Sequence, residues 1–113
     1  MRIIADSITS SDLKEMAGTL FGNMVKAVVD IDRELLAVDA ELHSDLEALL
    51  LQNGSRQEYL WGINLYPELQ GDDFVEFDSM INLRPSQGNQ SRGVEDEKIR
   101  RRIVDVIAKR VTR

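Results

Sequence analysis

The sequence predicts an α+β domain with a mainly antiparallel sheet of about five strands and three helices, in the order β-α-β-β-α-β-β-α. Two pairs of strand-like segments are each joined by a short connection, which indicates two β-hairpins. Three other segments place apolar residues at intervals of three and four, the spacing of a helix that buries one face. Because hairpins build antiparallel sheets, we expect the helices to cover one face of this sheet.

The first half of the chain is expected to contain a short strand, a helix and a hairpin. Residues 2–5 read as the first strand. Thr9 is the expected N-cap of a helix that ends at Gly22. Residues 24–32 alternate apolar and polar side chains, which is typical of a half-buried strand, and residues 34–39 supply its hairpin partner.

Residues 39–54 allow two interpretations. As a helix, this segment would be capped by Ser44 and ended by Gly54. As a strand, it would place on one side Asp39, Glu41, His43, Asp45 and Glu47. That side would be a possible metal site, with the histidine as the nitrogen ligand. The leucine- and alanine-rich run 46–52 favours a helix, and a strand continuing from the preceding hairpin would be about three times the usual length. We therefore predict a helix.

The second half of the chain is expected to form a hairpin, a polar loop and a helix. Residues 59–66 and 74–83 are rich in aromatic and branched side chains and predict two strands, joined by a loop at 67–73. Residues 85–93 contain no large apolar side chain and predict a loop. Asp96 is the expected N-cap of the last helix. The apolar face of that helix is expected to comprise Ile99, Ile103, Val106, Ile107 and Val111.

Length and composition exclude several classes of protein. The chain has 113 residues, the length of one domain, so residues 1–113 are expected to form a single α+β domain. It has no cysteine, which excludes disulfides and a cysteine nucleophile, and one histidine, which excludes a multi-histidine metal centre in a single chain. The apolar runs are too short for a membrane span or a signal-peptide core, so we expect a cytoplasmic protein with no membrane partner.

The net charge of −6 conceals an uneven distribution. Residues 1–83 carry 16 acidic and 5 basic side chains, whereas residues 84–113 carry 4 acidic and 9 basic side chains. We expect the basic C-terminal helix to pack across its own acidic domain or across a second copy of the chain. A surface for nucleic acid or another polyanion is the weaker interpretation, because the acidic part of the chain repels phosphate.

Three stretches of the sequence are distinctive. They are MVKAVVDI at 24–31, LWGINLYP at 60–67 and EFDSMINLRPSQGNQSRGVED at 76–96. They resemble a family of short, uncharacterised prokaryotic proteins, and the resemblance covers almost the whole chain. It implies a small stand-alone prokaryotic protein. It transfers no activity, substrate or catalytic residue.

The first candidate site is the polar loop 84–93. Its side chains that can donate hydrogen bonds are Arg84, Ser86, Gln87, Asn89, Gln90, Ser91 and Arg92. Gly88 and Gly93 would let backbone amides approach a ligand, and the loop leads into a helix N-terminus, which suits anions. A carboxylate, a phosphate or a protein partner fits this pattern. The alternative is an ordered loop whose side chains satisfy its own backbone.

The second candidate site is the polar face of the last predicted hairpin. The residues on this face are Asn64, Glu76, Asp78, Asn82 and Arg84. The predicted register places Asn64 opposite Glu76 and Gly62 opposite Asp78, so that the glycine leaves a notch beside the Asp78 carboxylate. Such an Asp–Glu pair suits acid–base chemistry or a divalent ion. The alternative is the solvated side of a sheet that is buried on one face only.

These observations favour a non-catalytic binding or interaction protein that uses the loop 84–93 and the polar hairpin face. The expected binding residues are Asn64, Asp78, Asn82, Arg84, Ser86, Gln87, Asn89, Ser91 and Arg92. We expect no catalytic residue, metal or cofactor, because no group of residues has the types and spacing that a reaction demands. The expected partner is an unidentified protein or a small anionic ligand, and a homodimer stays open.

Two other functions remain as alternatives. The first is a small enzyme that acts on a phosphorylated or carboxylated metabolite, with Asp78 or Glu76 as the base or a metal ligand and Arg84 and Arg92 holding the anion. The second is polyanion binding by the basic C-terminal helix.

Overall fold

The computed structural model describes residues 1–113, and its elements follow the expected order with two short strands added. The helices are α1 (Ser10–Thr19), α2 (His43–Gln52) and α3 (Glu97–Arg110). The strands are β1 (Arg2–Ile4), β2 (Ile8–Thr9), β3 (Val25–Asp30), β4 (Leu35–Val38), β5 (Leu60–Leu65), β6 (Val75–Glu76) and β7 (Val111–Thr112). Single 3-10 turns are η1 (Gln57–Tyr59), η2 (Gly71–Phe74), η3 (Met80–Asn82) and η4 (Pro85–Gln87).

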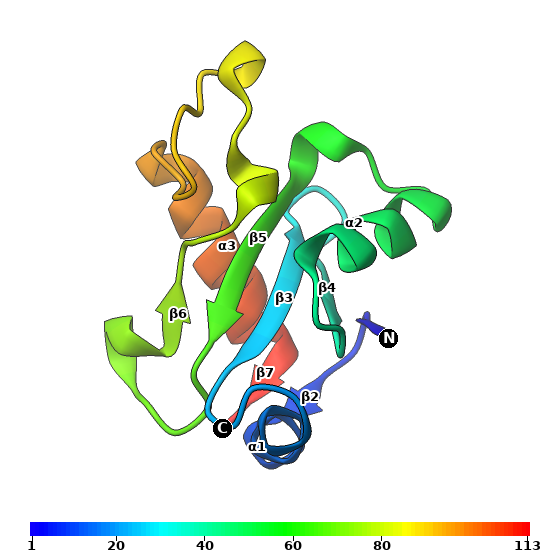
Figure 1. Cartoon of the computed structure of the whole chain (residues 1–113), viewed down its shortest axis with the longest axis vertical. Helices are drawn as coiled ribbons and strands as arrows, with labels where there is room; N and C mark the ends of the chain where they lie inside the picture. Colours follow the sequence, from blue (N-terminus) through cyan, green and yellow to red (C-terminus); the bar gives the residue numbers. More distant parts are fainter.

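Five strands form one sheet in the order β1-β4-β3-β5-β6, and every neighbouring pair is antiparallel (Figure 1). The predicted α+β class and the antiparallel five-stranded sheet are therefore confirmed. The strands β2 and β7 form a separate parallel pair, with Ile8 opposite Val111. This pair joins the start and the end of the chain, and neither strand is long enough to leave a periodic signal in the sequence.

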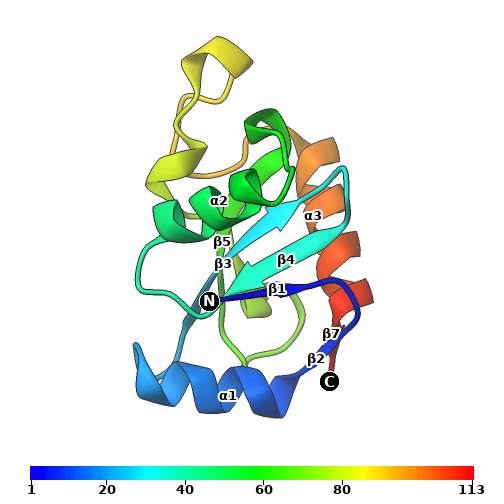
Figure 2. The ribbon, with the colours of Figure 1, turned by 90° about the vertical axis from the view of Figure 1, so that its right-hand side faces the viewer.

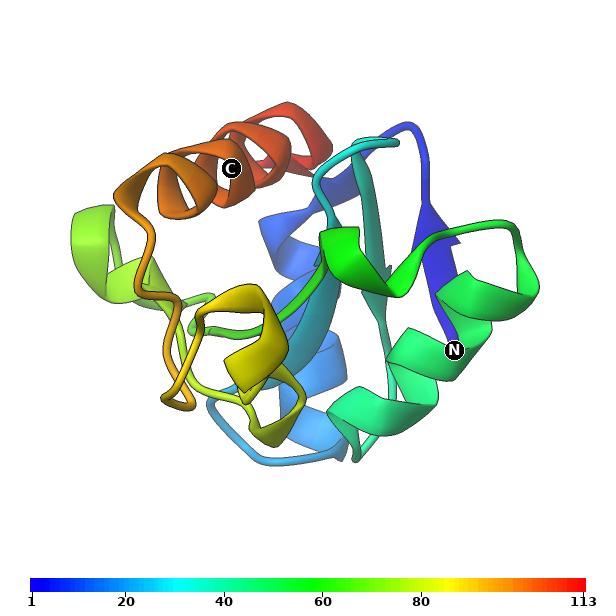
Figure 3. The same ribbon diagram turned by 90° about the horizontal axis from the view of Figure 1, so that it is seen from above.

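Helices cover both faces of the sheet, so the expectation that they share one face is wrong. The views in Figures 2 and 3 place α2 and α3 on opposite sides of the sheet and α1 across its lower end. Helix α2 packs through Leu46 and Leu50 in a small apolar cluster with Val28 and Ala37. Helices α1 and α3 belong to a larger cluster on the other face. The strands β3, β4 and β5 are consequently buried on both sides.

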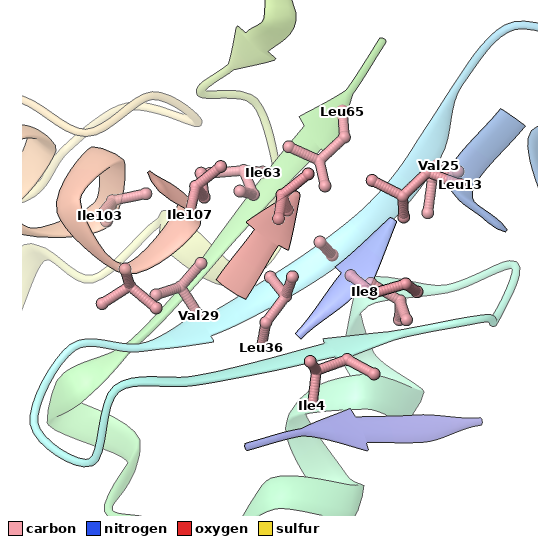
Figure 4. Close-up of a cluster of buried hydrophobic side chains, with 14 of the residues drawn as sticks. Ile4, Ile8, Leu13, Val25, Val29, Leu36, Ile63, Leu65, Ile103 and Ile107 are labelled. Carbon is pink, nitrogen blue, oxygen red and sulfur yellow. The ribbon is translucent and has the colours of Figure 1, made fainter. Parts of the chain in front are cut away.

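The larger cluster holds 20 buried side chains and forms the main core (Figure 4). Its members include Ile4, Ile8, Leu13, Val25, Val29, Leu36, Ile63, Leu65, Ile103 and Ile107. Successive residues of a strand point to opposite faces, so Val29 belongs to this cluster whereas Val28 belongs to the cluster under α2. Four of the five residues expected on the apolar face of the last helix are buried here: Ile103, Val106 and Ile107 in α3, and Val111 at the start of β7.

Two of the predicted helix starts are confirmed by their caps. The Thr9 hydroxyl accepts a hydrogen bond from the backbone N–H of Asp12 at 3.1 Å. The Asp96 carboxylate accepts one from the backbone N–H of Lys98 at 2.8 Å. Each cap satisfies one of the N–H groups that a helix leaves unpaired in its first turn.

The ambiguous segment 39–54 contains helix α2, as predicted, but Ser44 does not cap it. The helix begins at His43, and the N-cap residue is Leu42, which makes no side-chain capping hydrogen bond. The end is close to the predicted one, because Gly54 adopts a positive φ of 97° just beyond the helix. The N-terminal end of α2 therefore lacks the polar side chain that usually closes such an end.

The predicted strand 74–83 is largely wrong, because only Val75 and Glu76 pair with β5. Asn64 lies opposite Glu76, so the predicted register is correct where the strand exists. Beyond it the chain leaves the sheet and forms η3. Ser79 holds this departure in place: its backbone N–H donates to Arg92 O at 2.9 Å, and its hydroxyl accepts from the Ile81 N–H at 3.3 Å.

The side chain of Asn82 replaces the missing part of β6. Its Oδ1 accepts from the Gly62 N–H at 2.8 Å, and its Nδ2 donates to Gly62 O at 2.9 Å. A carboxamide thus makes the two hydrogen bonds that a paired strand residue would make. A Cβ atom on Gly62 would lie 2.5 Å from the Ser79 Cβ, so Ser79 fills the notch that the sequence places beside Asp78. That expected notch does not exist.

Candidate ligand-binding pocket

A pocket of about 510 Å³ opens where the chain leaves the sheet after β6. It lies between the N-terminal end of α2 and the polar side of β3, β5 and β6. Its polar residues are Lys26, His43, Ser44, Asn64, Tyr66, Glu76, Asp78, Ser79 and Arg92, and its apolar residues are Met24, Leu42, Met80 and Ile81. A space of this size suits a small molecule.

Three polar side chains form a row across the floor of this pocket. Lys26 on β3 lies opposite Asn64 on β5, and Asn64 lies opposite Glu76 on β6. Residues directly opposite one another in antiparallel strands share a face of the sheet. The row therefore runs from a cation through an amide to a carboxylate. The floor of the pocket is therefore positively charged at its β3 end and negatively charged at its β6 end.

Asn64 is the most deeply buried polar residue of the row, with 5% of its surface exposed. Its Nδ2 donates to Glu76 Oε1 at 2.8 Å and to the Asp78 carbonyl at 3.3 Å. Its Oδ1 is buried and has no hydrogen-bond partner. Because a buried polar atom without a partner is destabilising, a donor that reached this oxygen through the pocket would stabilise the protein.

Glu76 accepts a second hydrogen bond on the same oxygen, from the Tyr66 hydroxyl at 3.1 Å. Burial and the neighbouring negative charge of Glu76 raise the pKa of Tyr66 above its ordinary value. The phenol therefore stays protonated and donates. Asn64 and Tyr66 together fix one oxygen of the Glu76 carboxylate and leave the other oxygen without a hydrogen bond in the protein.

His43 is the first residue of α2 and is buried at the edge of the pocket. Its Nε2 lies 2.8 Å from the Ile63 carbonyl, which can only accept, so Nε2 carries the proton. Burial lowers the pKa of the ring below its ordinary value of 6.5; the charge of Lys26 lowers it further and that of Asp78 opposes this. The imidazole is therefore neutral at neutral pH, and its Nδ1 is an acceptor.

The N-terminal end of α2 contributes a positive end to the pocket. The first N–H groups of a helix have no partner within the helix, and they carry a partial positive charge. In α2 the N-cap residue Leu42 offers no side-chain acceptor, and its carbonyl accepts only from the Asp45 N–H at 3.2 Å, so the N–H groups of His43 and Ser44 remain unpaired. Leu42, His43 and Ser44 all line the pocket. An anionic group would find donors here.

Asp78 and Arg92 form an ion pair at the rim of the pocket, with Arg92 Nε 2.7 Å from Asp78 Oδ1. Both side chains are about half exposed. Each charge is neutralised by the other, so neither residue is free to hold a charged ligand without first losing its partner.

Of the nine residues predicted to bind, the structure brings Asn64, Asp78 and Arg92 together in this pocket. Three others are exposed to solvent in the loop and do not line the pocket; these are Ser86, Gln87 and Ser91. The exposed part of the loop projects from the body of the molecule, next to η4 (Figure 1). The last three, Asn82, Arg84 and Asn89, hold the loop against the domain.

Arg84 is buried beneath the loop, with 8% of its surface exposed. Its guanidinium donates to the backbone carbonyls of Ile81, Gln57 and Leu60. It also lies 3.6 Å from a Glu47 carboxylate oxygen. These contacts occupy the guanidinium with partners inside the protein, so it is not free to bind a ligand. Arg84 is therefore placed to stabilise the fold, and it does not line the pocket.

Asn89 closes the loop on itself. Its Nδ2 donates to the carbonyls of Asn82, Ser91 and Gly93, and its Oδ1 accepts from the Glu95 N–H at 2.9 Å. This arrangement matches the alternative stated for the loop, in which side chains satisfy the loop's own backbone.

Sequence reasoning missed Lys26, Ser44, Tyr66 and Ser79 as pocket residues and did not predict His43 as a binding residue. Lys26 left a signal, because it is the one charged side chain between the apolar residues 24–29 of a strand. The residues that lie beside Lys26 could not be identified from the sequence, because β3 pairs with β5, and β4 and α2 separate these two strands along the chain.

The basic residues of α3 are largely bound to the chain itself. Arg102 donates to Ile31 O at 2.9 Å, Arg110 donates to Glu34 O at 2.8 Å, and Lys109 forms an ion pair with Glu34 at 3.0 Å. The helix therefore packs across its own acidic domain, which is one of the two arrangements expected from the sequence.

No group of three or more histidine, aspartate or glutamate side chains is gathered closely enough to hold a metal ion. His43 lies on a helix, so the ionisable face of the strand interpretation does not form. None of the three helices combines the length and the apolar character that a transmembrane helix needs.

A family model described as a protein of unknown function, DUF5674, matches residues 2–110. No curated protein and no solved structure matches the chain.

Proposed function

Because the chain belongs to the DUF5674 family, whose description assigns no function, we propose its role from the pocket alone: the protein binds a small polar molecule between α2 and the polar side of the β5–β6 hairpin. This keeps the non-catalytic binding role expected from the sequence. It moves the site from the loop 84–93 to the face of the hairpin, because Asn82, Arg84 and Asn89 are bound internally.

The observation that carries this proposal is the unpartnered Oδ1 of Asn64 on the floor of the pocket. Folding buries this oxygen without giving it a hydrogen bond, which costs roughly 1–3 kcal/mol. A ligand N–H or O–H would recover that energy. The same oxygen lies between a cation and a carboxylate, which supply further contacts for a polar ligand.

We test this proposal by screening a library of small polar metabolites for thermal stabilisation and for shifts of backbone amide signals by NMR. A molecule bound in the pocket shifts the amides of His43 and Asn64. Its effect is lost in Asn64→Ala and kept in Asn23→Ala, a control at an exposed asparagine with no side-chain hydrogen bond. A library without any such molecule, or one whose binders ignore Asn64→Ala, contradicts the proposal.

The second candidate is a small enzyme that acts on a carboxylated or phosphorylated metabolite at the same pocket. The position of His43 favours it: the ring lines the same pocket as Glu76 and Asp78, and its Nε2 is bonded to the Ile63 carbonyl, so its Nδ1 adds a proton acceptor to the carboxylates. Asp78 or Glu76 would be the base, and Lys26 would hold the anion in place of the internally bound Arg84. Conversion of a bound metabolite, followed by NMR and abolished in Asp78→Asn, would replace the binding role with this one.

The proposal also includes a source, a cellular location and an oligomeric state for the protein. The resemblance to short prokaryotic proteins supports a prokaryotic source. We propose a cytoplasmic location, which fractionation of the source cells would test. A homodimer is supported by β1, which pairs with β4 alone and leaves its outer edge open. Light scattering distinguishes a dimer from a monomer, and a monomer at all concentrations rejects that part of the proposal.

A further inference from the structure

The charged side chains of the pocket fall into two groups. Asp78 and Arg92 neutralise each other in an ion pair. Lys26 and Glu76 form no ion pair within the protein. The Lys26 ammonium lies 5.1 Å from the centre of the Phe21 ring, an interaction that orients a cation without neutralising it. The pocket thus offers one uncompensated positive and one uncompensated negative side chain.

These two charges stand at opposite ends of the pocket floor. Lys26 is on β3 and Glu76 is on β6, with Asn64 of β5 between them in register. Two strand spacings separate their backbones, which is roughly 10 Å. A ligand lying across the floor therefore meets a positive end and a negative end.

The positive end has two independent parts. One is the Lys26 ammonium, and the other is the N-terminal end of α2, whose first N–H groups have no capping side chain at Leu42. Both favour a carboxylate, and the Ser44 hydroxyl adds a donor at the same end.

The negative end is built for a donor. Tyr66 and Asn64 fix Glu76 through its Oε1, and the unpartnered Asn64 Oδ1 is a second acceptor in the same row. Two acceptors of this kind, one of them charged, suit an ammonium group, which carries three donors and no acceptor. Met24, Leu42, Met80 and Ile81 line the remaining space and suit a short hydrocarbon.

We propose that the ligand is a small aminocarboxylate zwitterion, which lies across the floor with its carboxylate toward Lys26 and the start of α2 and its ammonium toward Glu76 and Asn64. This inference rests on the binding role proposed above and names the class of molecule bound. A ligand with two anionic groups would place one beside Glu76, and a diamine would place one ammonium beside Lys26. Both arrangements bring like charges together.

The experiment compares matched probes by NMR titration. The probes are the common α-amino acids and the straight-chain ω-amino acids of increasing length, each with its N-acetyl derivative and its carboxamide. We expect one or more zwitterions to bind and both derivatives to bind roughly 10- to 100-fold more weakly, the range for loss of one charge-assisted hydrogen bond.

Two variants assign the two ends of the ligand. Lys26→Gln should weaken the zwitterion by a similar factor and remove its advantage over the carboxamide. Glu76→Gln should remove its advantage over the N-acetyl derivative. Lys14→Gln and Glu68→Gln, exposed residues that do not line this pocket, should leave the affinities unchanged.

The outcomes separate this inference from the binding role itself. If the carboxamide or the N-acetyl derivative binds as tightly as the zwitterion, or if another class of metabolite binds through Asn64 and no aminocarboxylate does, the ligand class is wrong and the binding role survives. If neither the probes nor the metabolite library binds, both are wrong. If a zwitterion binds and is insensitive to Lys26→Gln and Glu76→Gln, the assigned orientation and site are rejected.

Discussion

Replacing Asn82 with alanine should detach the segment that follows β6 from the sheet. Asn82 is fully buried, and its carboxamide supplies the hydrogen bonds that β5 would otherwise receive from a strand. The Asn82→Ala change removes the partner of the Gly62 N–H and the partner of the Gly62 carbonyl. It also removes a donor to the Arg92 carbonyl, which still accepts from the Ser79 N–H. Two buried backbone groups are therefore left unsatisfied.

The expected loss of stability follows from these two groups. An unsatisfied buried donor or acceptor costs about 1–3 kcal/mol, so two of them should lower the free energy of unfolding by about 2–6 kcal/mol. For a domain of this size, 1 kcal/mol corresponds to about 4 °C in the melting temperature. The melting temperature should therefore fall by roughly 8–24 °C.

Urea unfolding gives the free energy, and hydrogen exchange gives the location of the change. The Gly62 amide should be protected in the wild-type protein and should exchange rapidly in Asn82→Ala. The control is Asn23→Ala, an exposed site whose substitution should change stability by less than about 0.5 kcal/mol. A loss below about 1 kcal/mol, or a Gly62 amide that stays protected in Asn82→Ala, would refute the view that this side chain replaces a strand.

Two other residues give further predictions: one concerns a loss of stability, and the other concerns the dependence of stability on pH. Arg84→Met keeps an extended apolar side chain but leaves Glu47 and the carbonyls of Ile81 and Leu60 without their partner, so urea unfolding should show a loss of roughly 3–5 kcal/mol; a near-neutral result rejects the structural role of Arg84. His43 has a folded-state pKa below 6.5, so the unfolded chain binds more protons between the two values. Its stabilising contribution is present above pH 6.5 and is lost as the pH falls through the folded-state pKa. The stability difference between wild type and His43→Gln should therefore shrink on acidification, and a difference independent of pH contradicts the burial of a neutral ring.

The elements that the sequence predicts correctly are those specified by neighbouring residues. The caps at Thr9 and Asp96 depend on side chains that bond to the backbone two or three residues away. The first hairpin depends on alternation within 24–39, and it forms as expected, with β3 and β4 in adjacent antiparallel positions. Signals of this kind are complete within one segment of the chain, so no tertiary contact is needed to interpret them.

The placement of the helices required information that no single segment contains. Strand β4 has four consecutive buried residues, which is the pattern of a strand covered on both faces. The same short apolar run also fits a half-buried strand at the end of a hairpin. The second apolar cluster, formed by Leu46 and Leu50 of α2 against Val28 and Ala37, decides between the two, and it is visible only when the elements are assembled.

The candidate site was predicted in part. The polar face of the hairpin and the pairing of Asn64 with Glu76 followed from alternation, and both are present in the pocket. The roles of Arg84 and Asn89 could not be separated from those of Arg92, because all three are polar residues in one loop. Burial distinguishes them: the first two are almost inaccessible and bond to backbone carbonyls, whereas Arg92 is exposed at the rim.

The failure of the strand prediction at 77–83 and the existence of the pocket have the same cause. A strand continuing from Glu76 would pair with Gly62 and place Asp78 opposite it, filling the edge of β5 with backbone. Ser79 and Asn82 instead hold the chain away from the sheet and satisfy that edge with a side chain. The residues beyond Glu76 then rise beside α2 and form one wall of the pocket. Since natural sequences depart from simple local patterns mainly where a site requires it, this departure is a further physical argument that the pocket is functional.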